Sequence, residues 1–297
     1  MNALSIQHVR SFNRTVAERI GALDDRFLGR ARPMGEARTL WEIGPDGTEV
    51  RTLRLQLGLD SGYMSRVLRS LERQGLVVIG TSSDDRRVRR VQLTVAGLAE
   101  RAELERRSND VARSILEPLS DRQRARLVTA MMEVERLLNA SMVRFAIEDP
   151  TSPDARWCIE QYFVELNTRF ESGFDPSLSI AADAHALVPP AGALLIARLR
   201  ERPVGCVALK LHPGAPAEVK RMWVAPEARG LGLGRRLLHE VEQYAREAGV
   251  AVLRLETNRA LTEAIALYRS SGYHEVDAFN DEPYAHHWFE KHVTSPT

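Results

Sequence analysis

Apolar residues recur at helical spacing through the first 140 residues, and then strand and helix patterns alternate to the end of the chain. The first apolar stripe predicts one long amphipathic helix over residues 4–29. Its members are Leu4, Val9, Phe12, Val16, Ile20, Leu23 and Phe27. Further helices are predicted near 34–43, 49–57, 60–74, 95–116 and 121–138, with short strands at 77–79 and 91–93. A strand at 142–148 and a turn at 148–155 open the alternating region, which predicts a mixed α/β domain.

This change of pattern divides the 297 residues into two domains, 1–139 and 140–297. Residues 1–139 hold 24 arginines, no lysine and 19 acidic residues, a net charge of +5, whereas residues 140–297 hold 17 basic and 21 acidic residues, a net charge of −4. A mildly basic first domain is consistent with a nucleic-acid partner, although many solvated helical faces carry as much charge. The expected fold is therefore a mainly α domain followed by a mixed α/β domain.

Cysteine usage and hydropathy indicate the compartment. Cys158 and Cys206 have neither metal nor redox spacing, and we expect them to be small buried residues in a reducing environment. The first twenty residues lack the apolar core of a signal peptide, and no run of about eighteen apolar residues exists. The sequence predicts a cytoplasmic protein without a membrane segment.

Residues 52–77 have the pattern of a helix-turn-helix. Leu53 and Leu57 face inward from the first helix, and Gly58 provides the turn. The buried stripe of the second helix is expected at Met64, Val67, Leu68 and Leu71. Its outer face then carries the residues suited to phosphates and base edges in a major groove, which are Ser61, Tyr63, Ser65, Arg66 and Arg69.

The two short strands that follow predict a hairpin with a charged tip. Its arginines are Arg86, Arg87, Arg89 and Arg90. Arginine on a thin hairpin can enter a minor groove, where the potential is most negative. The alternative is an ordinary solvated loop.

In this order, the long first helix, the helix-turn-helix, the hairpin and the two closing helices resemble the MarR family of winged-helix regulators. The match covers about residues 1–138 and includes D-x-R at Asp85–Arg87 followed by Leu93-Thr94. The resemblance implies a homodimer joined through the first and last helices and bound to double-stranded DNA. It also implies that Arg87 contacts DNA and that Asp85 steadies the wing. The competing interpretation is a winged helix kept only as a dimerisation module.

The most specific pattern of the chain is a glycine-rich loop between a strand at 218–224 and an amphipathic helix. The loop runs Arg229-Gly230-Leu231-Gly232-Leu233-Gly234, and the helix turns Leu237, Leu238, Val241 and Tyr244 inward. Glycines at a helix start let backbone N–H groups approach an anion, and Arg235 and Arg236 could pair with phosphates. The spacing excludes G-x-G-x-x-G, because residue 235 is Arg and residue 237 is Leu, and no P-loop Lys-Ser/Thr pair follows.

The R-x-x-G-x-G of this loop resembles the pyrophosphate-binding signature of the GNAT superfamily of N-acetyltransferases. The strand ending Met222-Trp223-Val224 and the segment AIALYRSSGY at 264–273 also match, so that the resemblance covers about residues 140–297. It implies acetyl-CoA as cosubstrate, with the pantetheine arm on the backbone of Met222–Val224. The residues implied to hold the pyrophosphate are Arg229, Gly230, Leu231, Gly232, Leu233, Gly234 and Arg235.

The same resemblance assigns further roles. Tyr268 matches the tyrosine that protonates the departing thiolate, a role that suits a phenol of pKa near 10; the alternative is a core aromatic on its helix. The family often has an asparagine seven residues earlier, where this chain has Leu261, so we expect Asn258 to contact the cofactor instead. The amine must lose a proton, and Glu218 stands where many members keep the base; a solvated strand-edge acid is the alternative, and Glu256 is a second candidate.

Neither a metal nor an acceptor is specified by a motif. His286 and His287 are adjacent in an expected strand, so they point to opposite faces and cannot chelate together. The tail near the active-site end holds acidic and aromatic candidates for binding an amine, which are Asn280, Asp281, Glu282, Tyr284, His286 and Trp288. A small amine or an amino acid is the first choice, and a protein lysine or an antibiotic amine stays open.

Two functional hypotheses follow. The first is an acetyl-CoA-dependent N-acetyltransferase fused to a MarR-type DNA-binding regulator domain. The alternative is a transcriptional regulator whose GNAT domain only senses acetyl-CoA or a metabolite. An intact glycine loop is needed by both, whereas Tyr268 is needed only by the enzyme.

Overall fold

The computed structural model describes residues 2–21, 27–29, 32–81, 88–180 and 182–293. The chain forms two compact units, Met1–Met131 and Met132–Thr297, and the division falls within one helix, α6 (Asp121–Ser141). The expected domain boundary at residues 139 and 140 lies at the end of the same helix and stays a prediction.

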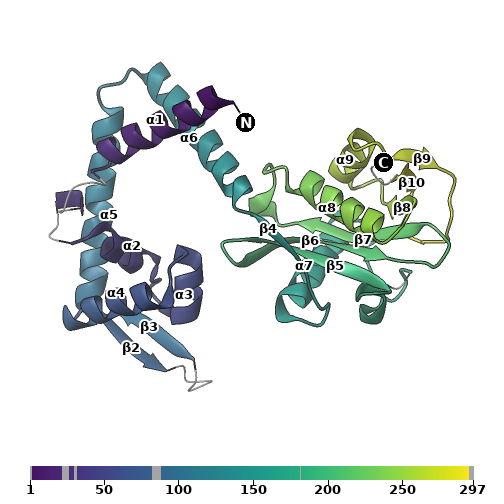
Figure 1. The fold of residues 1–297 in the computed structure, drawn as a ribbon, viewed down its shortest axis with the longest axis horizontal. Helices are drawn as coiled ribbons and strands as arrows, with labels where there is room; N and C mark the ends of the chain where they lie inside the picture. Colours follow the sequence, from purple (N-terminus) through teal and green to yellow (C-terminus); the bar gives the residue numbers. More distant parts are fainter. Residues whose placement is uncertain (1, 22–26, 30–31, 82–87, 181, 294–297) are drawn as a thin grey trace. The chain divides into compact units, whose positions relative to one another are not determined.

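The first unit is a winged helix-turn-helix, as predicted (Figure 1). Its elements besides the first part of α6 are α1 (Ala3–Arg19), α2 (Met34–Glu42), β1 (Thr48–Glu49), α3 (Val50–Leu57), α4 (Ser61–Arg73), β2 (Val77–Thr81), β3 (Arg89–Leu93) and α5 (Val95–Leu116). Gly58 ends α3 with φ 64°, and the Asp60 carboxylate caps α4 by accepting a hydrogen bond from the N–H of Tyr63 at 2.9 Å. This tight turn sets the angle between the two helices.

The core of the first unit includes the predicted stripes, of which Leu57 is half-buried, together with residues of α2, the hairpin and α5. Met64, Val67, Leu68 and Leu71 of α4 are buried, together with Leu53 of α3. The sheet has one strand that the pattern did not indicate, because the two-residue β1 pairs with β3 in the order β1-β3-β2. A strand this short has no alternation from which it could be predicted.

The prediction of one helix over residues 4–29 is wrong. Helix α1 ends at Arg19, and Gly21 follows with φ 64°, a left-handed conformation that commonly stops helices. Phe27 lies in a separate 3-10 turn, Phe27–Gly29, and Leu23 lies outside the described residues. The apolar stripe of α1 is exposed, with Leu4, Val9, Phe12 and Val16 between 36% and 59% accessible.

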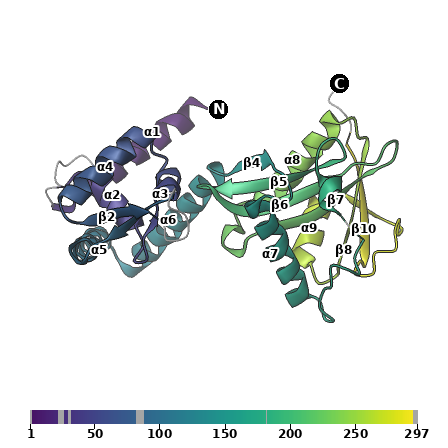
Figure 2. The ribbon, with the colours of Figure 1, turned by 90° about the horizontal axis from the view of Figure 1, so that it is seen from below.

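The second unit is built on a seven-stranded sheet of order β4-β5-β6-β7-β8-β10-β9. Its elements are β4 (Arg144–Ile147), α7 (Pro153–Arg169), β5 (Gly192–Leu199), β6 (Arg202–Lys210), β7 (Ala217–Val224), α8 (Leu233–Glu247), β8 (Val252–Thr257), α9 (Thr262–Ser270), β9 (His274–Val276) and β10 (His287–His292). Helices α7 and α8 cover opposite faces of the central strands (Figure 1), and α7 runs across the face seen in Figure 2. Cys158 and Cys206 are buried in this core as free thiols, as expected.

The sheet is split between β7 and β8. These strands form the single parallel pair of the described sheet, and the pairing is limited to Ala217 with Leu253 and Glu218 with Arg254. Beyond Glu218, β7 bulges: Cys206 opposes Trp223 and Ala208 opposes Lys220, so two β7 residues face one residue of β6. Arg221 sits in this bulge with φ 51°. The parallel pair therefore opens toward the carboxyl end of β7, which leads into the glycine loop.

Candidate active site

A cavity of about 530 Å³ lies where β7 and β8 separate beside the start of α8; we call it the glycine-loop cavity. Nine of the residues predicted to hold the cofactor line it, namely Met222, Trp223, Val224, Arg229, Gly230, Gly232, Leu233, Gly234 and Arg235. Leu231, the remaining residue of the loop, is half-buried and packs against the hydrophobic core instead. The fold thus brings the strand end and the loop together around one space.

The start of α8 is open to an anion. Gly232 occupies the N-cap position in the left-handed region, at φ 71°, and no side chain of the described residues caps the helix. The first-turn N–H groups of a helix have no partner within the helix, and they carry the positive end of its dipole. Arg235 also lies at this helix start, and its guanidinium donates one hydrogen bond, to Ser270 Oγ at 3.3 Å. Arg236 donates instead to the carbonyl oxygens of Ala140 and Val143, so its guanidinium is already engaged and does not serve the anion.

A carboxylate on α7 fixes the loop, and no sequence motif indicated it. Glu165 Oε2 accepts from the indole N–H of Trp223 at 2.9 Å and from the guanidinium of Arg229. Its other oxygen pairs with Arg169 at 3.3 Å, and Arg169 continues to Glu263 at 2.6 Å. No spacing rule connects Glu165 to a motif more than fifty residues away, so only the packing of α7 against β7 identifies it.

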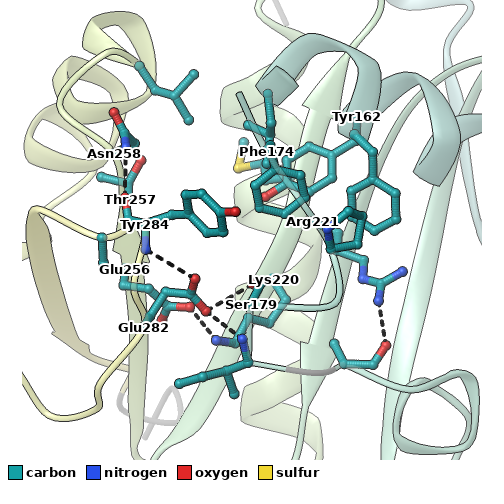
Figure 3. A pocket seen from close by; sticks show the side chains of 18 of the residues that line it. Tyr162, Phe174, Ser179, Lys220, Arg221, Glu256, Thr257, Asn258, Glu282 and Tyr284 are labelled. Carbon is teal, nitrogen blue, oxygen red and sulfur yellow. Dashed lines mark hydrogen bonds and ion pairs between the residues drawn. The ribbon is translucent and has the colours of Figure 1, made fainter. Parts of the chain in front are cut away.

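A second cavity of about 220 Å³ shares Met222 and Tyr268 with the first. We call it the aromatic cavity (Figure 3). Its walls hold a cluster of rings from α7, the following segment and the loop before β10, which are Tyr162, Phe163, Phe170, Phe174 and Tyr284. Phe174 stacks on Phe163 at 5.6 Å between centroids and contacts Tyr284 at 4.8 Å. Such walls suit an apolar or aromatic ligand body.

The floor of the aromatic cavity carries an ion pair between two strands. Lys220 of β7 donates to Glu256 of β8 (Figure 3). The Lys220 ammonium also lies 3.1 Å from Glu218. Glu256 lines the cavity, and its Oε2 is buried without a hydrogen-bond partner among the described residues. Burial alone would lower the pKa of Lys220, but the two carboxylates outweigh it and raise that pKa.

Glu218, the first candidate for the base, lines neither cavity in the described part of the chain. Its carboxylate contacts Lys220, and its Oε1 lies 3.1 Å from Nε2 of His212. Burial alone would raise the pKa of Glu218, but Lys220, His212 and Lys210 hold it below the ordinary value. Because Glu256 lines the aromatic cavity and Glu218 does not, Glu256 is the better-placed of the two candidates.

Tyr268 forms part of the wall that both cavities share. It is 7% exposed, and its hydroxyl lies 3.8 Å from Sδ of Met222. Burial, and next the charge of Glu256, raise the pKa of this phenol above its ordinary value, so it keeps its proton at neutral pH. A protonated hydroxyl thus stands between the glycine-loop cavity and the aromatic cavity.

Several of the remaining site candidates have structural partners. Asn258 lines the aromatic cavity rather than the glycine-loop cavity, and its amide donates to the Tyr284 carbonyl while its Oδ1 accepts from the Ala260 N–H. Glu282 is buried and accepts from Ser179 Oγ at 2.9 Å and from the Ile180 N–H at 2.7 Å. Trp288 donates to Asn280, and His287 pairs with Glu275. Among the residues that the structure describes, no three His, Cys, Asp or Glu side chains gather in a metal-binding cluster.

The residues predicted to meet DNA lie as expected on α4, while Asp85, Arg86 and Arg87 fall outside the described residues. Ser61, Arg66 and Arg69 are exposed, and Ser65 is half-buried. Tyr63 is half-buried with its hydroxyl packed against Gly35, and the Arg66 guanidinium lies 5.8 Å from its ring centroid. Ser65, Arg69 and Arg89 border one hollow between α4 and the hairpin.

No helix in the described chain is long and apolar enough to cross a membrane.

Comparisons with known proteins give matches to each part of the chain. A model of the acetyltransferase (GNAT) family matches residues 156–273. An IAA acetyltransferase of Azospirillum brasilense is 43% identical over 98 residues, 33% of this chain and 64% of that protein. An uncharacterized N-acetyltransferase of Schizosaccharomyces pombe is 34% identical over 136 residues, 44% of this chain and 80% of that protein. A MarR-family transcriptional regulator from a Rhodococcus species aligns at 20% identity and a TM-score of 0.39, covering 46% of this chain and 96% of that one.

Proposed function

This chain belongs to the GNAT family of acetyltransferases, and we propose that its second unit transfers the acetyl group of acetyl-CoA to a small primary amine. One observation carries the proposal: the glycine-loop cavity and the aromatic cavity adjoin, and Met222 and Tyr268 belong to both. The first offers an uncapped helix start to a pyrophosphate, and the second offers rings and a carboxylate to an amine.

The residues of the two cavities divide the chemistry between them. Arg229, Arg235 and the N–H groups at the start of α8 would bind the phosphates, and the end of β7 would position the thioester. The amine nitrogen bonds to the acetyl carbon, the carbon–sulfur bond breaks, and the leaving thiolate takes the proton of Tyr268. The proton lost by the amine goes to Glu256, directly or through a bridging water.

The experiment that tests this proposal is release of free thiol from acetyl-CoA with a panel of small amines, amino acids and a lysine peptide. Release that requires one of the small acceptors supports the enzyme. If calorimetry gives tight acetyl-CoA binding but no acceptor gives release, the second unit is a sensor and the proposal fails.

For the first unit we propose binding of double-stranded DNA by a homodimer. The exposed Arg66 and Arg69 on α4, beside the hairpin, favour DNA as partner because they present charge on the helix that a winged helix places in a major groove. The exposed stripe of α1 favours a second copy, since long unpartnered apolar stripes mark interaction surfaces.

A further inference from the structure

Arg221 is a cation to which the proposed acetyl transfer gives no task. It lines the aromatic cavity from the bulge of β7 (Figure 3), where Val219, Lys220, Arg221 and Met222 all reach the lining although a regular strand would alternate them. The bulge therefore places an extra side chain in this cavity. The extra side chain is that of Arg221, which uses one of its N–H donors in a hydrogen bond to another described residue.

Lys220 and Arg221 differ in their partners. Lys220 is held by two carboxylates. Arg221 makes one hydrogen bond, from Nη2 to the Ala182 carbonyl at 2.7 Å, and its guanidinium lies 5.2 Å from the Phe163 ring centroid. Among the described residues no carboxylate lies within 4.0 Å of it, although Asp183 also lines the cavity. Most of its five N–H donors are thus open to a ligand.

The backbone of Arg221 supports a ligand role for its side chain. A residue other than glycine at φ 51° costs about 1 kcal/mol or more, and such conformations cluster at binding and catalytic sites. Glycine would form the same bulge without this strain. Burial also lowers the pKa of Arg221, which means that keeping the charge in this place is unfavourable until an anion compensates it.

Resting on the proposed acetyl transfer, we propose that Arg221 recognises the carboxylate of the acceptor, and that the acceptor is an α-amino acid with a large apolar or aromatic side chain. The cavity then presents one complementary group to each part of that molecule. Arg221 faces the carboxylate, Glu256 takes the amine, and the rings of Phe163, Phe174 and Tyr284 contain the side chain. The volume of about 220 Å³ is below the usual range for drug-sized ligands, which fits an acceptor of this size.

The test compares phenylalanine with phenethylamine, which lacks only the carboxylate, as acceptors for the full-length protein. A charged hydrogen-bonded pair predicts that kcat/KM is about ten- to a hundredfold higher for phenylalanine. In Arg221→Gly the ratio of the two kcat/KM values should fall to about one. Arg200→Gly is the matched control, because Arg200 is also an arginine at positive φ (49°) but is exposed in the β5–β6 turn; there the ratio should stay as in the unaltered protein.

Three outcomes overturn different parts of the proposal. If the unaltered protein uses neither compound nor any other amine, the proposed function itself fails. If it uses both equally well, or if Arg221→Gly keeps the preference for phenylalanine, acetyl transfer stands and the carboxylate role of Arg221 is wrong. If Arg221→Gly does not fold, Arg221→Asn replaces it, because asparagine tolerates the same backbone conformation. The comparison of phenylalanine with phenethylamine in the unaltered protein tests the preference for a carboxylate without any variant.

Discussion

The phenol oxygen of Tyr268 lies 3.8 Å from the sulfur of Met222, and both side chains belong to the wall between the glycine-loop cavity and the aromatic cavity. A group in this wall can reach a thioester from one side and an amine from the other. The sequence alternatives for Tyr268, core aromatic or proton donor, are therefore compatible: it is a buried aromatic with its hydroxyl at the boundary.

Tyr268→Phe should lower kcat by about 10²- to 10⁴-fold, because the thiolate loses its proton donor, while the Kd for acetyl-CoA stays within about threefold. Tyr273→Phe is the control: its ring centroid lies 6.0 Å from that of Tyr268, but in the described chain its buried side chain lines neither cavity. Steady-state kinetics and calorimetry give both quantities. Equal losses in the two variants would assign the effect to packing and remove Tyr268 from the chemistry.

Gly232→Ala should raise the KM for acetyl-CoA about tenfold. An added Cβ meets no described heavy atom within 4 Å, so the effect comes from the strain of φ 71°, which shifts the N-cap and its N–H groups. Gly249→Ala at the other end of α8 imposes a similar strain at φ 77° in equally open space. Gly249→Ala should lower the free energy of unfolding by about as much as Gly232→Ala and leave the KM for acetyl-CoA unchanged. A raised KM in both variants would refute the explanation that strain at the N-cap of α8 weakens binding.

Lys220→Met should destabilise the second unit by about 3 kcal/mol near pH 8, because Glu218 and Glu256 then face each other buried and without a cation. Because the pKa of Glu218 is lowered, this residue stabilises the folded state at pH values above 4.5, its ordinary pKa. Because the pKa of Lys220 is raised, this residue stabilises the folded state at pH values below 10.5, its ordinary pKa. Both contributions are thus present between about pH 5 and pH 10. The destabilisation should shrink toward pH 4.5, where the carboxylates of the variant take up protons.

Urea unfolding of Lys220→Met at pH 8 and at pH 5 measures this pH dependence. Adding Glu218→Gln to the variant should recover part of the stability at pH 8, since it removes one of the two facing charges. A destabilisation that is the same at both pH values would show that Lys220 acts through its packing rather than its charge.

Arg66→Ala should weaken binding to duplex DNA and reduce the slope of log affinity against log salt by about 0.9 for each phosphate that the variant no longer neutralises. Arg66 is exposed on α4, in the position of a recognition helix. Arg113→Ala on α5, whose guanidinium pairs with Asp110, serves as the comparison and should leave the slope unchanged. Titration of a labelled duplex from about 50 to 200 mM salt provides the slopes; identical slopes for all three proteins would exclude a phosphate contact by Arg66.

Phe12→Glu should convert a dimer to a 33.3 kDa monomer, because it places a charge in the exposed apolar stripe of α1. Asn13→Glu adds the same charge one residue away and should leave the dimer intact. Light scattering reports the mass. A monomeric unaltered protein would contradict the proposed dimer at once.

Local signals explain what the sequence could predict. Glycine, proline and the spacing of leucines predicted the helix-turn-helix and α8, since Gly58 and Gly232 end or begin helices by their own conformational freedom. The family motifs predicted nine residues of the glycine-loop cavity, because those residues are consecutive or nearly so. The end of α1 was not predicted because the apolar spacing continues past Gly21, and a single glycine is a weak stop signal inside such a pattern.

Contacts between distant segments could not be predicted in this way. Arg221 reaches the aromatic cavity because of a bulge, and nothing in the alternation of β7 indicates an irregular register. The rings of the aromatic cavity come from α7, the segment after it and the loop before β10, and only the fold brings them together. The choice between Glu218 and Glu256 likewise depends on which carboxylate faces the cavity, which is a property of strand divergence rather than of spacing.

Glu165 joins Trp223, Arg229 and Arg169 around the glycine loop without help from a ligand. A loop with these internal bonds does not have to be ordered when its substrate arrives, so little conformational entropy is lost on binding. The same bonds mean that a phosphate must share Arg229 with an existing carboxylate. In the proposed enzyme a phosphate therefore gains less from Arg229 than it would from an unpaired guanidinium.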